Sequence, residues 1–118
     1  MELRPIGKVR RSSDTEVVLD LRRAYVEGLE GIAPGDTVQV LYWMHGLSHN
    51  DRRLLRVPPQ GDTSIPVRGV FSLRSCVRPN PIGVSMVEVV RVEGEQLVVL
   101  GIDAQEGPPL IDIKAASR

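Results

Sequence analysis

The stretch that decides the fold lies at residues 84–102 and reads VSMVEVVRVEGEQLVVLGI. Two segments rich in valine and leucine flank the short polar sequence Glu93-Gly94-Glu95. β-branched residues favour strands, and a short loop containing glycine is typical of a β-hairpin. We therefore predict that residues 84–92 and 96–102 form neighbouring antiparallel strands.

Four other short segments share this β-prone composition, and most are bounded by Gly, Pro, Ser or Asp, which mark turns. They cover residues 3–9, 16–21, 37–44 and 67–71. With the hairpin they make six predicted strands.

Only residues 21–31 have a helical pattern, in which Leu21, Ala24, Tyr25 and Leu29 recur at a spacing close to 3.6. A parallel sheet needs several crossover helices, so a doubly wound fold is excluded. Closure of a sheet into a barrel removes the exposed edges of short strands. The predicted fold is mainly β, a single small and mostly antiparallel β-barrel with one short helix.

Length and composition predict one soluble domain over residues 1–118, since 42% of the residues are apolar and 25% are charged. No apolar run approaches the ~18 residues that span a bilayer, and the N-terminus is charged where a signal peptide would be apolar. A single cysteine, Cys76, excludes an internal disulfide and a cysteine-based zinc site. We expect a cytoplasmic protein that binds neither a membrane nor a metal ion.

Charge is unevenly distributed although the formal net charge is zero. Residues 52–91 carry seven basic and two acidic side chains, whereas the segments before and after are net negative. A nucleic acid would therefore have to meet a local patch, for which the candidates are Arg52, Arg53, Arg56 and Arg68. The alternative is that these arginines belong to an ordinary solvated loop.

Residues 74–85 read RSCVRPNPIGVS, and Pro79 and Pro81 hold this backbone extended. Two arginines four positions apart, the Asn80 amide and a glycine suit a polar ligand that carries a carboxylate, a ribose or an adenine edge. A rigid connector before a strand, with Asn80 capping a turn, is the alternative interpretation.

Three ordered blocks carry a family resemblance: RGVF at 68–71, RPNPIG at 78–83 and DAQEGPPLIDIK at 103–114. With Pro5-Ile6-Gly7, YVEGL at 25–29 and YWMH at 42–45, they resemble the TsaA/YaeB-like family of tRNA methyltransferases, called TrmO, over nearly the whole chain. The resemblance implies a β-barrel that binds S-adenosylmethionine at a homodimer interface. It further implies methyl transfer to the exocyclic nitrogen of threonylcarbamoyladenosine, beside the anticodon of tRNA.

The resemblance also implies the site residues. The cofactor positions are His45, Arg74, Arg78, Asn80, Pro81, Ile82, Gly83 and Val84, with a second wall formed by Gln105, Glu106, Gly107 and Pro108. The basic residues Arg52, Arg53, Arg56 and Arg68 become the expected tRNA contacts. By residue type His45 or Asp112 is the candidate base, but each has an equally good structural interpretation, so the base stays unassigned.

The chain departs from the family pattern at three places. Cys76-Val77 stand where a proline and a ring are usual, Pro108-Pro109 where the family has Thr-Pro, and Ala115-Ala116 where it has Pro-Tyr. These departures leave two alternatives open. One is a dimeric barrel that binds S-adenosylmethionine or a nucleotide without catalysis, and the other is a methyltransferase with a different small-molecule or RNA acceptor.

Overall fold

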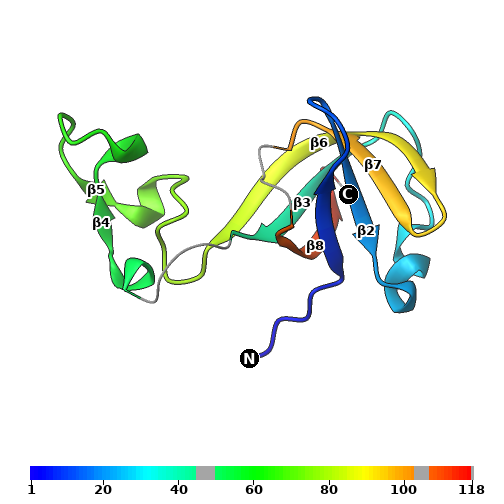
Figure 1. Cartoon of the computed structure of the whole chain (residues 1–118), viewed down its shortest axis with the longest axis horizontal. Helices are drawn as coiled ribbons and strands as arrows, with labels where there is room; N and C mark the ends of the chain where they lie inside the picture. Colours follow the sequence, from blue (N-terminus) through cyan, green and yellow to red (C-terminus); the bar gives the residue numbers. More distant parts are fainter. Residues whose placement is uncertain (45–49, 103–106, 118) are drawn as a thin grey trace. The chain divides into compact units, whose positions relative to one another are not determined.

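The computed structural model describes residues 1–44, 50–102 and 107–117 (Figure 1). The chain forms two compact units. The barrel unit comprises Met1–Trp43 and Val84–Arg118, and the inserted unit comprises Met44–Gly83. The prediction of one domain over residues 1–118 stays a prediction.

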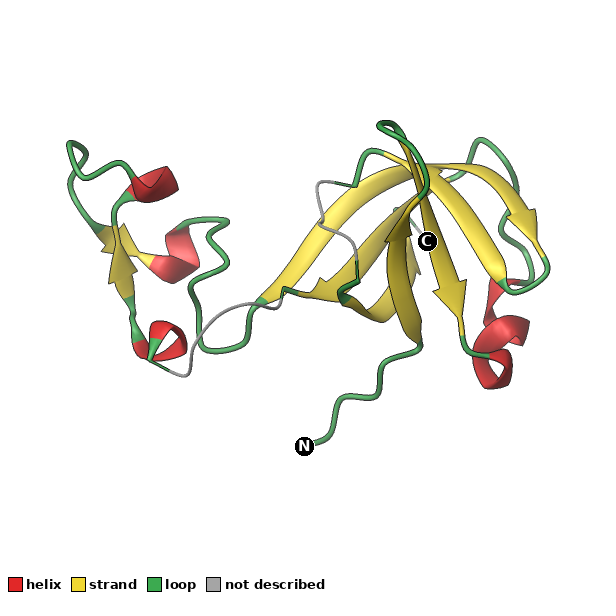
Figure 2. Ribbon diagram, in the orientation of Figure 1, coloured by secondary structure: helices red, strands yellow, loops and turns green. Residues whose placement is uncertain are grey.

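The strands of the barrel close on themselves in the order β1-β2-β7-β6-β3-β8, which confirms the predicted β-barrel (Figure 2). All strand pairs of the barrel whose residue register is assigned are antiparallel. The strands are β1 Gly7–Arg11, β2 Glu16–Leu21, β3 Thr37–Trp43, β6 Ile82–Glu93, β7 Gln96–Leu100 and β8 Pro109–Ala115.

The hairpin predicted at residues 84–102 is formed by β6 and β7. Its last pair is Glu93 with Gln96, and Gly94 takes a positive φ of 56° in the connecting turn, a conformation that favours glycine. The register shifts between Val89 and Arg91, so Val90 forms a bulge.

The core of the barrel unit is built almost entirely from valine and leucine. Val17, Val18 and Leu19 are buried in succession on β2, as are Leu97, Val98 and Val99 on the paired strand β7. Burial of each such side chain contributes about 1.5–3 kcal/mol. No polar or charged residue is buried within the described part of the chain.

The predicted helix is present as η1, Arg23–Leu29, inside the predicted range 21–31. It is a 3₁₀ helix with Leu29 as its buried residue. Two hydrogen bonds between residues three apart lie at the end of η1. The Glu30 N–H donates to the Glu27 carbonyl, and the Ile32 N–H donates to the Leu29 carbonyl.

Strand β8 was not among the predicted strands. It begins at Pro109, which a strand accepts at its first position, and exposed Asp112 and Lys114 interrupt its apolar residues. In the inserted unit, only Arg68–Gly69 of the predicted strand 67–71 forms a strand, β5, which pairs with β4, Arg56–Val57. The rest forms the 3₁₀ helix η4, Val70–Ser72.

The inserted unit also contains the 3₁₀ helices η2, Asp51–Arg53, and η3, Pro59–Gly61. Its buried apolar side chains are Val70 and Pro81, whereas five large hydrophobic side chains in its described part are exposed. These are Leu54, Leu55, Ile65, Val67 and Phe71. The helices of the described residues are all too short or too polar to cross a membrane.

Gly7 offers a direct test of barrel closure, because it pairs with Leu21 of β2 and with Leu110 of β8. A Cβ atom at this position would collide with the backbone carbonyl of Asp20. We predict that Gly7→Ala lowers the free energy of unfolding by about 2 kcal/mol or more, measured by denaturant titration. Gly28→Ala is the matched control and should leave stability unchanged or slightly raised, since a Cβ there meets open space.

Asp20 ties three strands together: its Oδ2 accepts a hydrogen bond from Arg10 Nε on β1 (2.8 Å) and its Oδ1 one from Gln96 Nε2 on β7 (2.9 Å). Desolvation of the partly buried carboxyl raises its pKa, but the Arg10 and Gln96 hydrogen bonds, together with the charges of Arg10 and Lys8, outweigh this and lower the pKa below 3.8. A lowered pKa stabilises the fold above that ordinary value, and the stabilisation is lost as pH falls through the folded-state pKa.

We therefore predict that Asp20→Asn costs about 1 kcal/mol of unfolding free energy at pH 7. The gap between wild type and variant should narrow as the pH is taken below the ordinary value of 3.8. The difference in unfolding free energy is measured by thermal unfolding of both proteins at a series of pH values from 7 downward. A difference that stays constant with pH would contradict the stabilising role assigned to the Asp20 carboxylate.

Candidate functional site

The loop formed by Pro79, Asn80 and Pro81 is held by hydrogen bonds to each of its three carbonyl groups. Arg52 Nε donates to the Pro79 carbonyl (3.0 Å), the Ile82 N–H to that of Asn80 (2.7 Å) and the Met44 N–H to that of Pro81 (2.7 Å). The Pro81 side chain is buried. Two prolines and three occupied carbonyls make this backbone rigid, as the sequence predicts.

Arg78 holds the segment that precedes this loop by hydrogen bonds to backbone carbonyl groups. Its Nη1 donates to the carbonyls of Leu73 (3.2 Å) and Ser75 (2.7 Å), and the Val77 N–H donates to Ser75 Oγ (3.0 Å). Nε and Nη2 of Arg78 have no acceptor among the described residues. Arg78 thus shapes the loop through Nη1, and the N–H groups of its two other nitrogens are left for a ligand.

Asn80 presents the unused polar groups of this loop. Its side chain is exposed, and neither its backbone N–H nor its side-chain amide finds a partner within the described residues. The Arg74 side chain, six positions earlier, is also exposed. The loop therefore offers amide and guanidinium groups that suit a carboxylate or the edge of an adenine ring.

Ile82, half-buried, and Gly83, buried, are the last residues of the inserted unit and begin β6. The other cofactor positions with a described structure lie in the barrel unit. The Gly107 N–H donates to the Val9 carbonyl (2.8 Å) and the Val9 N–H to the Pro108 carbonyl (2.9 Å), which fixes the turn before β8 onto β1. Gly107 has a φ of 98°, and Pro108 is buried. Val84 on β6 is exposed.

The predicted positions His45, Gln105 and Glu106 lie outside the described residues. Among the residues that are described, no three His, Cys, Asp or Glu side chains gather as a metal site would require. The absence of a metal ion stays a prediction, as does the whole set of cofactor residues.

The four arginines predicted to meet tRNA differ in their local contacts. Arg52 is half-buried and engages the Pro79 carbonyl. Arg53, Arg56 and Arg68 are exposed, and their guanidinium groups have no hydrogen-bond or ion-pair partner within residues 1–44, 50–102 and 107–117. The last three are therefore the better candidates for contact with phosphate.

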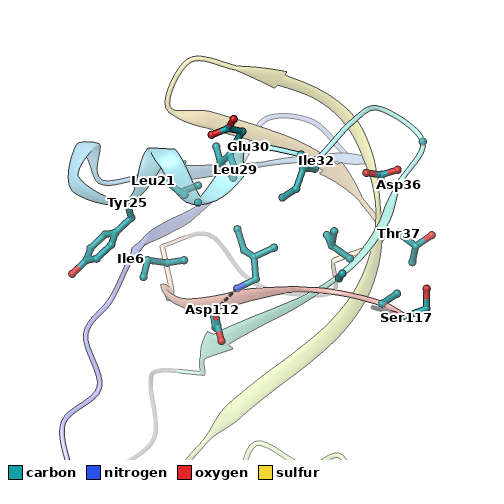
Figure 3. Close-up of a pocket in the computed structure, with 17 residues that line it drawn as sticks. Ile6, Leu21, Tyr25, Leu29, Glu30, Ile32, Asp36, Thr37, Asp112 and Ser117 are labelled. Carbon is teal, nitrogen blue, oxygen red and sulfur yellow. Dashed lines mark hydrogen bonds between the residues drawn. The ribbon is translucent and has the colours of Figure 1, made fainter.

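A pocket that the sequence did not reveal lies in the barrel unit, with a volume of about 800 Å³ (Figure 3). It is bounded by η1, the connection from η1 to β3, and β8. Asp112, one of the two candidate bases, lines it and accepts a hydrogen bond from the Ile113 N–H through Oδ1 (2.9 Å). The signal available in the sequence was the group Gly28, Gly31 and Gly35, which all line the pocket.

Comparison with known proteins gives one consistent family. Residues 6–117 match the model of the tRNA-methyltransferase O N-terminal domain. A probable S-adenosyl-L-methionine-binding protein of Methanocaldococcus jannaschii is 40% identical, over 98% of this chain and 92% of its own length. An S-adenosyl-L-methionine-binding protein of Archaeoglobus fulgidus is 41% identical, over 99% of this chain and 90% of its own length.

Among solved structures, TrmO from Pseudomonas aeruginosa superposes with a TM-score of 0.72 at 27% identity. The match covers 98% of this chain and 55% of that protein, so the chain spans about half the length of the TrmO protein of known structure.

The Arg78 hydrogen bonds yield a prediction about loop order. Because Nη1 holds the Leu73 and Ser75 carbonyls, Arg78→Ala should speed amide hydrogen exchange at Val77 about tenfold, the effect of removing about 1.4 kcal/mol of local stability. Arg53→Ala, which removes an exposed arginine of the same unit, should leave this rate unchanged. Equal exchange rates in both variants and the wild type would show that Arg78 does not order the loop.

Proposed function

The chain belongs to the family of tRNA-methyltransferase O N-terminal domains, and we propose on that basis that it binds S-adenosylmethionine and transfers the methyl group to tRNA. The proposed acceptor is the exocyclic nitrogen of threonylcarbamoyladenosine beside the anticodon. The observation that carries the proposal is the rigid Pro79–Pro81 loop, whose exposed Asn80 keeps its donors unused, within a chain whose relatives are named for S-adenosylmethionine binding.

The donor set of the loop fits the polar ends of S-adenosylmethionine. The Asn80 amide has a donor and an acceptor side by side, as hydrogen bonding to an adenine edge requires, and Arg74 offers a guanidinium to the methionine carboxylate. Half-buried Ile82 and exposed Val84 continue the same segment into β6 and supply apolar contact, while Pro81 and Gly83, which are buried, hold the backbone. Gly107 and Pro108, which belong to the barrel unit and are held on β1, stay predicted cofactor positions.

S-Adenosylmethionine, when bound, supplies a methyl group on a positively charged sulfur that departs as a neutral thioether. The work left for the protein is alignment of the acceptor nitrogen and removal of one proton from it. A preformed, rigid loop provides alignment at little entropic cost. No described residue of that loop is a carboxylate or a histidine, so the proton acceptor stays unassigned.

The inserted unit is the proposed surface for tRNA. Exposed Arg53, Arg56 and Arg68 carry positive charge that no described carboxylate neutralises. Arg56 lies on β4 and Arg68 on β5, and the hairpin formed by these two strands holds both residues on one small scaffold. Contacts of this kind fix the position of an RNA backbone without reading its sequence.

A second copy of the chain is the proposed cover for the exposed apolar side chains of the inserted unit. Phe71 is 77% exposed and Leu55 57%, and three more large apolar side chains of this unit are exposed. Water-exposed apolar groups at this density are typical of an interface. A homodimer buries them, in agreement with the dimer that the family resemblance implies.

Cofactor binding is tested by calorimetric titration with S-adenosylmethionine. Arg74→Ala should weaken binding at least tenfold, about 1.4 kcal/mol, because the variant has no guanidinium to pair with the carboxylate. Arg53→Ala should bind as the wild type does. Equal affinity of the wild type and Arg74→Ala would contradict the assigned site, and no binding by the wild type, with or without tRNA, would contradict the proposed function.

Binding of tRNA is tested by its salt dependence. Changing Arg53, Arg56 and Arg68 together to Ala should weaken tRNA binding and flatten its logarithmic salt slope by about 2 to 3, close to one unit for each phosphate that is no longer neutralised. Arg4, Arg22 and Arg23, exposed on the barrel unit, form the matched control triple. An unchanged slope in the first triple would exclude the inserted unit as the tRNA surface.

Catalysis is separated from simple binding by incubating the protein with S-adenosylmethionine and tRNA that carries threonylcarbamoyladenosine. Mass spectrometry of the digested tRNA should show one added methyl group on that nucleoside. Cofactor binding without any methylated nucleoside would support the alternative of a non-catalytic binding protein.

A further inference from the structure

The Asn80 N–H is the one main-chain donor of residues 79–82 without a partner in the described part of the chain. Pro79 and Pro81 have no N–H, and the Ile82 N–H donates to the Asn80 carbonyl (2.7 Å). The loop therefore offers a ligand a single backbone donor. The direction in which this N–H points decides where an acceptor on the ligand can bind it.

Arg52 holds the same peptide group that carries this N–H. Its Nε donates to the Pro79 carbonyl (3.0 Å), and the Pro79 carbonyl and the Asn80 N–H belong to one peptide bond. The described residues contain no cis peptide bond, so this peptide is trans and planar. In a trans peptide the carbonyl and the N–H point in opposite directions. By fixing the carbonyl, Arg52 thus directs the Asn80 N–H to the side away from its own guanidinium.

The hydrogen bond from Arg52 also makes the Asn80 N–H a better donor. A guanidinium is charged, and hydrogen bonds from charged donors are stronger than those between neutral groups. Hydrogen bonds made at both ends of one peptide group polarise and strengthen each other. The loop is therefore prepared for an acceptor such as a ring nitrogen of adenine or a carboxylate oxygen.

Arg52 is itself held in place by the backbone around it. Its half-buried side chain starts from the middle of η2, where the Arg53 N–H donates to the Asn50 carbonyl (3.1 Å). Just beyond η2, the Leu55 carbonyl accepts a hydrogen bond from the N–H of buried Val70 (2.9 Å). Arg52 thus connects the cofactor loop to the ordered part of the inserted unit.

We propose that Arg52 is a positioning residue of the cofactor site, which aims the Asn80 N–H at S-adenosylmethionine. The inference rests on the proposed function, because it takes S-adenosylmethionine as the ligand of the loop. Positioning requires an N–H donor at the place of the Arg52 Nε atom. Contact with a tRNA phosphate, the role that the family resemblance gives Arg52, would require its positive charge instead.

Glutamine separates the two requirements. Its Nε2 atom stands the same number of bonds from the backbone as the Nε atom of arginine, so Arg52→Gln keeps an N–H donor there and removes the charge. Arg52→Ala removes both. Arg22→Ala, which removes an exposed arginine of the barrel unit, is the control.

The proposal is tested by calorimetric titration of these proteins with S-adenosylmethionine. Arg52→Ala should bind on the order of tenfold more weakly than the wild type, and Arg52→Gln should stay within about threefold of it. Arg22→Ala should bind as the wild type does. Equal weakening in Arg52→Ala and Arg52→Gln, or none in Arg52→Ala, would overturn the positioning role alone. No binding by the wild type, with or without tRNA, would overturn the proposed function and this inference with it.

The amide spectrum of isotope-labelled protein without ligand gives an independent readout. Because Arg52 polarises the peptide group, the nitrogen resonance of Asn80 should move in Arg52→Ala and move less in Arg52→Gln. The resonance of buried Val70 should stay in place in both variants. An unmoved Asn80 resonance in Arg52→Ala would show that Arg52 does not hold this peptide. A displaced Val70 resonance would show a general structural role, and would also overturn the proposal.

Discussion

Closure of the barrel by its last strand is the constraint on which the rest of the structure depends. β8 pairs on one edge with β1, through Gly7 and Leu110, and on the other with β3, through Val40 and Ile113. Every strand of the barrel then has two neighbours, and no edge is left to aggregate. The same pairing fixes the turn at Gly107 and Pro108. In the sequence, the inserted unit follows β3 and ends at the start of β6.

The parts of the fold that local sequence patterns determine were predictable. β2 and the β6–β7 hairpin follow from consecutive β-branched residues and a glycine turn, and their predicted bounds agree with the structure to within a few residues. β8 was missed because its pattern is weak: Pro109 opens it and the charges of Asp112 and Lys114 break its apolar run. Its stability comes from two partners far away in the chain, which no local window contains.

For the candidate site, the sequence predicted the local backbone, and its ligand contacts stay predictions. Pro79 and Pro81 predict a rigid loop, and the family resemblance implies that its ligand is S-adenosylmethionine. The partners of the individual arginines depend on tertiary contacts. Arg52 donates a hydrogen bond to the Pro79 carbonyl, 27 residues away, and Arg78 donates to a carbonyl of its own loop. The Arg53 guanidinium has no partner among the described residues. The pocket of the barrel unit could not be predicted, because its lining residues Ile6, Leu29 and Ile113 are far apart in the sequence and come together only when β8 closes the barrel.

The most direct test of the central claim is to titrate isotope-labelled protein with S-adenosylmethionine and map the amide shifts. Binding at the assigned loop predicts saturable shifts within residues 74–84, with no change at the isoleucines of the barrel pocket, Ile6 and Ile32. Saturable shifts confined to the pocket, with residues 74–84 unchanged, would contradict the assigned cofactor site.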